Sequence, residues 1–154
     1  MSAILHTATL FVALAVAAPA GAQVRAASAQ TTTPVVQAFE HYELVRAALA
    51  SDRLSDAAPH AKTLADRAEA AGGAEAKKAA DLLAAARNIE DARKHFGDLS
   101  TIFVPIFQAA AIPGTTAYTC SMKQKPWVQR GDKIENPYYG KSMLACGTVL
   151  PAKK

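Results

Sequence analysis

Two short segments near the C-terminus of this 154-residue chain each place a cysteine close to a methionine. The first has the order Cys120-x-Met122, and the second has the reverse order, Met143-x-x-Cys146. Side chains alternate between the two faces of an extended strand, so the first spacing would put both sulfurs on one side. Residues three apart are neighbours on a helical turn, so the second spacing would do the same. Two thiolates and two thioethers that converge would select a soft ion such as Cu(I).

The same two cysteines allow a second interpretation, a structural disulfide. In an oxidising compartment Cys120 and Cys146 would form the one bridge that two cysteines permit. The bridge would close a loop of about 26 residues and contribute roughly 3 kcal/mol to stability. The two methionines would then fill gaps in the core. From the spacing alone the disulfide is favoured, and the metal site and a pair of free buried thiols stay open as alternatives.

Residues outside these two segments offer one candidate metal ligand and no catalytic motif. His95 is a candidate for an extra ligand, because the helix predicted around it leads toward the sulfur segments. The chain has no G-x-S-x-G, no H-E-x-x-H and no glycine-rich phosphate loop. No histidine is placed by the sequence to activate a cysteine nucleophile. We therefore expect that the protein is not an enzyme.

Residues 1–22 predict a secretory signal peptide. An apolar run of about 15 residues ends in small residues, and Ala20-Gly21-Ala22 fits the A-x-A cleavage pattern. A transmembrane helix would need about 20 apolar residues, which is longer than this run. We expect export to a bacterial periplasm, with residues 23–33 as a disordered leader.

The charge of the chain excludes some partners. The formal net charge of +4 is a mild excess, and no basic run interleaves with aromatic residues. We therefore expect no nucleic-acid partner. Once the signal peptide is removed, we expect no membrane association either.

Apolar spacing of three and four residues predicts helices over most of the remaining chain. The first helix is predicted over 34–50, with Pro34 in its first turn. A second follows the polar link 51–55 and ends at Gly72-Gly73, and a third begins near residue 74. Asn88 could cap a fourth segment, with an unbroken helix through that point as the equal alternative, and the helical pattern ends before Pro113-Gly114. The predicted buried positions are Val35, Phe39, Tyr42, Val45, Leu49, Ala57, Ala61, Leu64, Ala65, Ala68, Ala79, Leu82, Leu83, Ala86, Ala92, Phe96, Leu99, Phe103, Ile106 and Phe107.

These segments predict a mainly α fold in a single domain. Residues 34–112 would form an up-and-down bundle of three to four helices, since the connections are short. Residues 113–154 would form a small irregular or short-β cap packed on the bundle. Within this cap we expect a short strand over 115–122, a loop with turns over 127–140 and one helical turn over 141–147.

The cap also carries a longer pattern, "YTCSM…W…IENPYYGKSMLACG". This pattern resembles the bacterial periplasmic domain of unknown function that accompanies copper/silver efflux adaptor (membrane-fusion) proteins. The helical stretches "LVRAALASDRLSDAAPHAKTLA" and "ARKHFGDLS" are similar as well, so the resemblance covers nearly all of the chain after residue 22. The matching positions of the second part are Ile134, Asn136, Pro137, Tyr138, Tyr139, Gly140, Met143, Leu144, Cys146 and Gly147.

The resemblance implies a periplasmic protein that binds Cu(I) or Ag(I) and takes part in copper handling or efflux. Its ligands would be Cys120, Met122, Met143 and Cys146, and its partner an efflux adaptor or another copper protein. The sequence departs from the family at Ser121, where the family usually has proline, but no sulfur is lost. The resemblance places the metal ahead of the disulfide. The alternative is a disulfide-stapled envelope domain that binds another protein and no metal.

Overall fold

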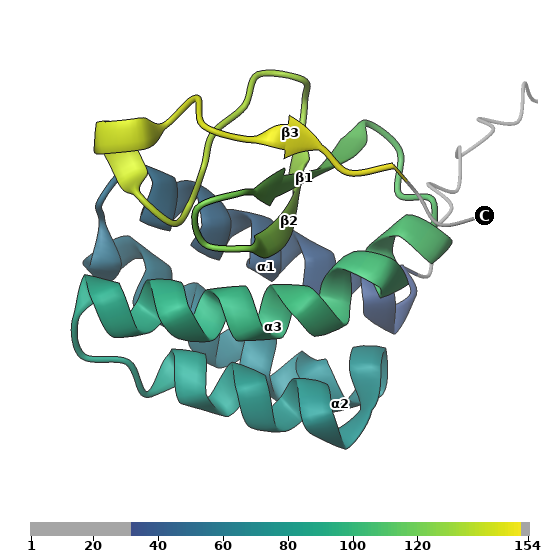
Figure 1. Ribbon diagram of the computed structural model, residues 1–154. Helices are drawn as coiled ribbons and strands as arrows, with labels where there is room; N and C mark the ends of the chain where they lie inside the picture. The colour runs from purple at the N-terminus through teal and green to yellow at the C-terminus, as the bar shows by residue number, and fades with distance from the viewer. Residues whose placement is uncertain (1–31, 152–154) are drawn as a thin grey trace, which may run out of the picture. The chain divides into compact units, whose positions relative to one another are not determined.

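The computed structural model describes residues 32–151 (Figure 1). The predicted signal peptide, residues 1–22, and all but the end of the predicted leader, 23–33, lie outside these residues. Helices come first along the described chain and short strands follow, which confirms the predicted mainly α fold with a short-β cap. The elements are α1 (Pro34–Ala50), α2 (Leu54–Ala84), α3 (Ile89–Ala109), β1 (Thr115–Cys120), β2 (Lys125–Arg130), the 3-10 helix η1 (Gly140–Met143) and β3 (Thr148–Val149).

Local capping residues fix where α1 and α3 begin. Thr33 precedes α1, and its Oγ1 accepts a hydrogen bond from the Val36 N–H at 3.3 Å. Asn88 precedes α3, and its Oδ1 accepts from the Asp91 N–H at 2.8 Å. Each cap satisfies a backbone donor that has no partner inside its helix. The predicted helix over 34–50 and the predicted cap at Asn88 are both confirmed.

Helix α2 is interrupted at Gly73, where the sequence predicts the end of one helix and the start of another. The φ angle of Gly73 is +79°, in the left-handed region that glycine adopts without steric cost. The second half of α2 buries Ala76, Ala80 and Leu83. Leu82, predicted to be buried, is 47 % exposed, because it lies about 100° around the helix from Leu83.

The described chain forms three layers (Figure 1). Helices α1 and α3 lie between α2 on one side and the small sheet on the other. The sheet is antiparallel, with the strand order β2-β1-β3. None of the helices in residues 32–151 has the length and apolar composition of a membrane-spanning segment.

The predicted loop over 127–140 is wrong in its first part, because residues up to Arg130 belong to β2. Strand β2 pairs with β1 along its length, from Thr115 opposite Arg130 to Cys120 opposite Lys125. Strand formation depends on a partner strand and on burial, which the local composition does not reveal. The pairing buries Trp127, Val128 and Gln129 against the helices.

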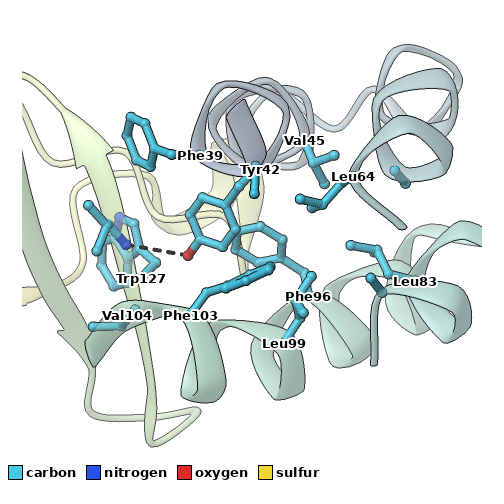
Figure 2. Packing of buried hydrophobic residues seen from close by; sticks show 14 of the residues in the cluster. Phe39, Tyr42, Val45, Leu64, Leu83, Phe96, Leu99, Phe103, Val104 and Trp127 are labelled. Carbon is cyan, nitrogen blue, oxygen red and sulfur yellow. Dashed lines mark hydrogen bonds between the residues drawn. The ribbon is translucent and has the colours of Figure 1, made fainter. Parts of the chain in front are cut away.

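Tyr42 of α1 lies between the layer of α1 and α3 and the sheet (Figure 2). Its hydroxyl is 2.7 Å from Ser100 Oγ on α3 and accepts a hydrogen bond from the Val128 N–H on β2 at 3.3 Å. Its ring stacks on Phe96, with centroids 4.8 Å apart, and meets the edge of Phe107 at 5.1 Å. Burial raises the pKa of Tyr42 far above its usual value, so the hydroxyl is neutral. One side chain therefore fixes the sheet to two helices.

The contact between α1 and α2 includes two histidine rings. His41 and His60 have ring centroids 5.8 Å apart. Burial lowers the pKa of His41 below 6.5, and the charges of Arg67 and His60 lower it further, while Glu40 opposes the shift. Folded His41 therefore binds a proton less readily than His41 in the unfolded chain.

This difference predicts a pH dependence of stability. The free energy of unfolding contains a contribution from neutral His41 that is complete above about pH 6.5 and falls as the pH drops below it. We expect the free energy of unfolding of the wild type, measured with urea, to fall between pH 7 and pH 5. The variant His41→Gln should lose less over the same range, since its side chain does not titrate. Equal losses in both proteins would contradict this assignment.

Candidate functional site

The sheet brings the two cysteine segments together. Cys120 is the last residue of β1 and is fully buried, whereas Cys146 is half-buried two residues before β3. Both are free thiols in the structure. Strands β1 and β3 pair with Thr119 opposite Thr148. If this register is continued by one residue, Cys120 faces Gly147, the residue next to Cys146.

Met143 and Cys146 lie one turn apart, as the spacing predicts. Met143 ends η1, and the Cys146 N–H donates to the Met143 carbonyl at 3.1 Å. This hydrogen bond closes the turn over the two residues between them. The helical turn predicted over 141–147 is confirmed in the form of η1 and the turn that follows it.

Met122 lies in a different environment from Cys120. Strand β1 ends at Cys120, and residues 121–124 form the turn into β2. Met122 is 59 % exposed, while Cys120 is 0 % exposed. The alternation rule that relates the two sulfurs holds only along a strand. The strand predicted over 115–122 is therefore two residues too long, and the argument from alternation does not apply to Met122.

His95 is not brought to the sulfur segments. On α3, Arg93 donates to the Pro137 carbonyl, and Gly97 faces Tyr138, so this side of the helix faces the cap. Two residues correspond to about 200° of helix rotation, so His95 points roughly 160° away from Arg93. Its Nδ1 is buried with no hydrogen-bond partner among the described residues.

Asn136 is the residue that holds the loop carrying Met143 and Cys146. The Asn136 side chain is 0 % exposed. Its Nδ2 donates to the Cys146 carbonyl at 2.6 Å, and its Oδ1 accepts from the Tyr138 N–H at 2.7 Å. The Asn136 N–H donates to the Leu144 carbonyl at 2.7 Å. The sequence pattern contains Asn136 but gives it no role, because its partners are up to ten residues away.

An ion pair fixes η1 to the helices. Asp52, in the link between α1 and α2, binds Arg93 of α3, and its Oδ2 accepts from the Lys141 N–H at 3.1 Å. The hydrogen bond from Arg93 lowers the pKa of Asp52, and the one from Lys141 lowers it further. Gly140 has a φ of +56°, and a Cβ there would overlap the Asp52 carboxylate and the Arg93 guanidinium. Glycine at this position therefore allows η1 to approach the ion pair.

A buried arginine of α1 holds the start of the same loop. Arg46 is 3 % exposed, and its Nε donates to Glu43 at 2.8 Å. Its Nη1 donates to the Glu135 carbonyl, also at 2.8 Å. Burial raises the pKa of Glu43, and Arg46 opposes this shift. A buried guanidinium needs such partners, so the loop and α1 are fixed to each other.

Trp127 lies beside the second cysteine segment. A Cβ on Gly147 would lie 2.5 Å from Trp127 Cη2, so glycine permits this close approach. The Trp127 Nε1–H donates to Gln129 Oε1 at 2.9 Å. Tyr138 packs edge-on against Trp127, with centroids 5.9 Å apart. Burial raises the pKa of Tyr138, and the nearby Tyr42 raises it further. The ring of Trp127 therefore packs closely against the end of the second cysteine segment.

The described residues hold no cluster of three or more His, Cys, Asp or Glu side chains arranged to bind a metal ion. Methionine sulfurs are not among the ligand types in such a cluster, so the predicted set of Cys120, Met122, Met143 and Cys146 stays a prediction.

Asn136 gives a test of this geometry. In Asn136→Ala the Cys146 carbonyl and the Tyr138 N–H lose their partners, at a cost of about 2–4 kcal/mol. We expect Cys146 to react faster with a thiol reagent in this variant than in the wild type. The control is Ser142→Ala, which loses only a bond from an exposed side chain to the Tyr139 carbonyl and should react at the wild-type rate. Equal rates in Asn136→Ala and the wild type would contradict the proposed role of Asn136.

Comparison with known proteins gives one match. The family model described as "Protein of unknown function (DUF3347)" matches residues 38–113. No curated protein matches the chain, and no solved structure matches it. The matched residues run from α1 to just beyond α3 and include His95, whereas the four sulfur residues lie after them. Over its helical part, the chain is similar to a family whose function is unknown.

Proposed function

We propose that this chain binds a soft metal ion, Cu(I) or Ag(I), in the bacterial periplasm and takes part in copper handling or efflux without catalysing a reaction. The observation that carries the proposal is the register of β1 and β3, which sets Cys120 next to the segment of Cys146. Metal binding would use both cysteines as reduced thiolates. Soft sulfur ligands favour Cu(I) over hard cations.

The four sulfur residues would have different roles. The thiolates of Cys120 and Cys146 would supply negative charge to a monovalent cation. Met143 would add a thioether from the turn that it shares with Cys146. Met122 lies on an exposed turn, and its flexible side chain could contact an ion that enters or leaves. His95 is not part of the proposed site, because it lies on the far side of α3 from the cap.

The surroundings of the cysteines support this assignment. Asn136, Arg93 and Arg46 each donate to a backbone carbonyl of the loop between β2 and β3, so contacts within the protein hold this loop in place. Groups that orient ligands in advance raise the affinity of a metal site. The resemblance of the cap to the efflux-associated domain supports copper and suggests an efflux adaptor or another copper protein as the partner.

The β1–β3 register also favours a second candidate function. Neighbouring cysteines on paired segments could form a disulfide, which would make the cap an interaction domain stapled between Cys120 and Cys146. Counting the free thiols of protein purified from the periplasm separates the candidates. Two reduced thiols support metal binding, whereas a disulfide that resists mild reductant, in a protein that rejects copper, supports the staple.

An anaerobic titration with Cu(I) against a competing chelator tests the metal site. We expect one ion per reduced chain and a change in the fluorescence of Trp127, the single tryptophan. Cys120→Ser/Cys146→Ser should lower the affinity at least about 100-fold, since it removes both thiolates. Ser121→Ala/Ser142→Ala is the matched control, because it changes the same two segments and leaves every sulfur in place. The proposal fails if the wild type and the double-serine variant bind Cu(I) equally weakly.

A further inference from the structure

A pocket with basic walls lies beside the proposed sulfur site. Its volume is about 350 Å³, and it is bounded by α3, the β1–β2 turn and η1. Four cationic side chains line it, Arg93, Lys94, Lys123 and Lys125, against one acidic side chain, Glu90. Pockets of this size bind small molecules or single side chains of a partner. The charge of the lining favours an anionic group.

Two of the four cations have acidic partners outside the pocket. Lys125 pairs with Asp98 at 2.8 Å, and Arg93 pairs with Asp52. Within residues 32–151, Lys94 and Lys123 form no ion pair. The Lys123 ammonium lies 5.2 Å from the centroid of the Tyr139 ring, a cation–π contact that orders the side chain. Lys94 and Lys123 thus remain available to bind carboxylates.

The pocket shares two of its walls, the β1–β2 turn and η1, with the methionines of the sulfur site. Lys123 follows Met122 in the β1–β2 turn, and Ser142, which also lines the pocket, precedes Met143 in η1. Met122 is well exposed on the same turn. The surface therefore combines free cations with an apolar side chain that lies outside the pocket lining. A small anion would cover the cations but not Met122, whereas a peptide segment could cover both.

We propose that this face docks an acidic segment of a partner protein, with its carboxylates on Lys94 and Lys123 and an apolar contact on Met122. Docking at this position would bring the partner next to both methionine-bearing segments. The further idea that the partner exchanges metal with this chain rests on the proposed function. The docking itself requires no metal, so it can be tested on the metal-free protein.

An amide NMR titration of the reduced, metal-free protein tests the docking. The probe is an eight-residue peptide of alternating glutamate and glycine, and the comparison probes are its glutamine counterpart and free glutarate. We expect the acidic peptide to shift the signals of Lys94, Lys123 and Tyr139, and to bind more weakly as salt is added. The glutamine peptide should cause no shifts, and glutarate should bind at least about tenfold more weakly.

Matched variants make the test specific. Lys94→Gln/Lys123→Gln should weaken the binding about tenfold, because two ion pairs are lost. Lys62→Gln/Lys78→Gln changes the net charge equally on exposed positions of α2 and should bind like the wild type. Glu90→Gln removes the one acid from the lining and should tighten the binding about twofold.

Three results would overturn the docking proposal. The first is an equal loss of peptide affinity in the two double-lysine variants. The second is glutarate binding as tight as that of the peptide, and the third is the absence of amide shifts at the residues that line the pocket. None of these results bears on Cu(I) binding, which the copper titration tests separately. Peptide binding without copper binding would keep the docking surface and reject the proposed function.

Discussion

The buried hydroxyl of Tyr42 is the constraint on which the arrangement of the layers depends. A hydroxyl in this position must be hydrogen-bonded, because an unpaired polar group in the interior is costly. Its partners are Ser100 on α3 and the backbone of β2, so α1, α3 and the sheet can meet in only one way. Once β2 is placed, its pairing places β1, and β1 in turn places β3. The neighbouring positions of the two cysteine segments follow from this order.

Polar contacts, together with the packing of Tyr138 on Phe96 and Trp127, hold the long connection between β2 and β3. Arg46 and Arg93 reach it from two helices, and Asn136 fastens it from within. Each of these side chains binds a backbone carbonyl, which fixes the path of the chain. Met122, by contrast, lies on a short turn with its side chain in solvent. The cap thus combines a fixed side, which carries Cys146, with an exposed side, which carries Met122.

The sequence predicts those features that depend on near neighbours along the chain. The helix over 34–50, the cap at Asn88 and the break at Gly73 all follow from capping or from backbone freedom within a few residues. Strand β2 was missed because it forms only against β1, and the role of Asn136 was missed because its partners are distant in sequence. The four sulfur residues were predicted as ligands from spacing and resemblance, and that role stays a prediction. Cys120 is buried while Met122 is exposed because β1 ends at Cys120, and the residue types do not determine where the strand ends.

The central claim is that the two cysteine segments, joined by the β1–β3 register, hold a soft metal ion through sulfur. X-ray absorption at the copper edge of the reduced, Cu(I)-loaded protein measures the donor atoms directly. The account predicts an inner coordination shell made of sulfur alone, with no nitrogen or oxygen donor, because His95 lies away from the cap. A shell that contains histidine nitrogen or carboxylate oxygen would contradict it.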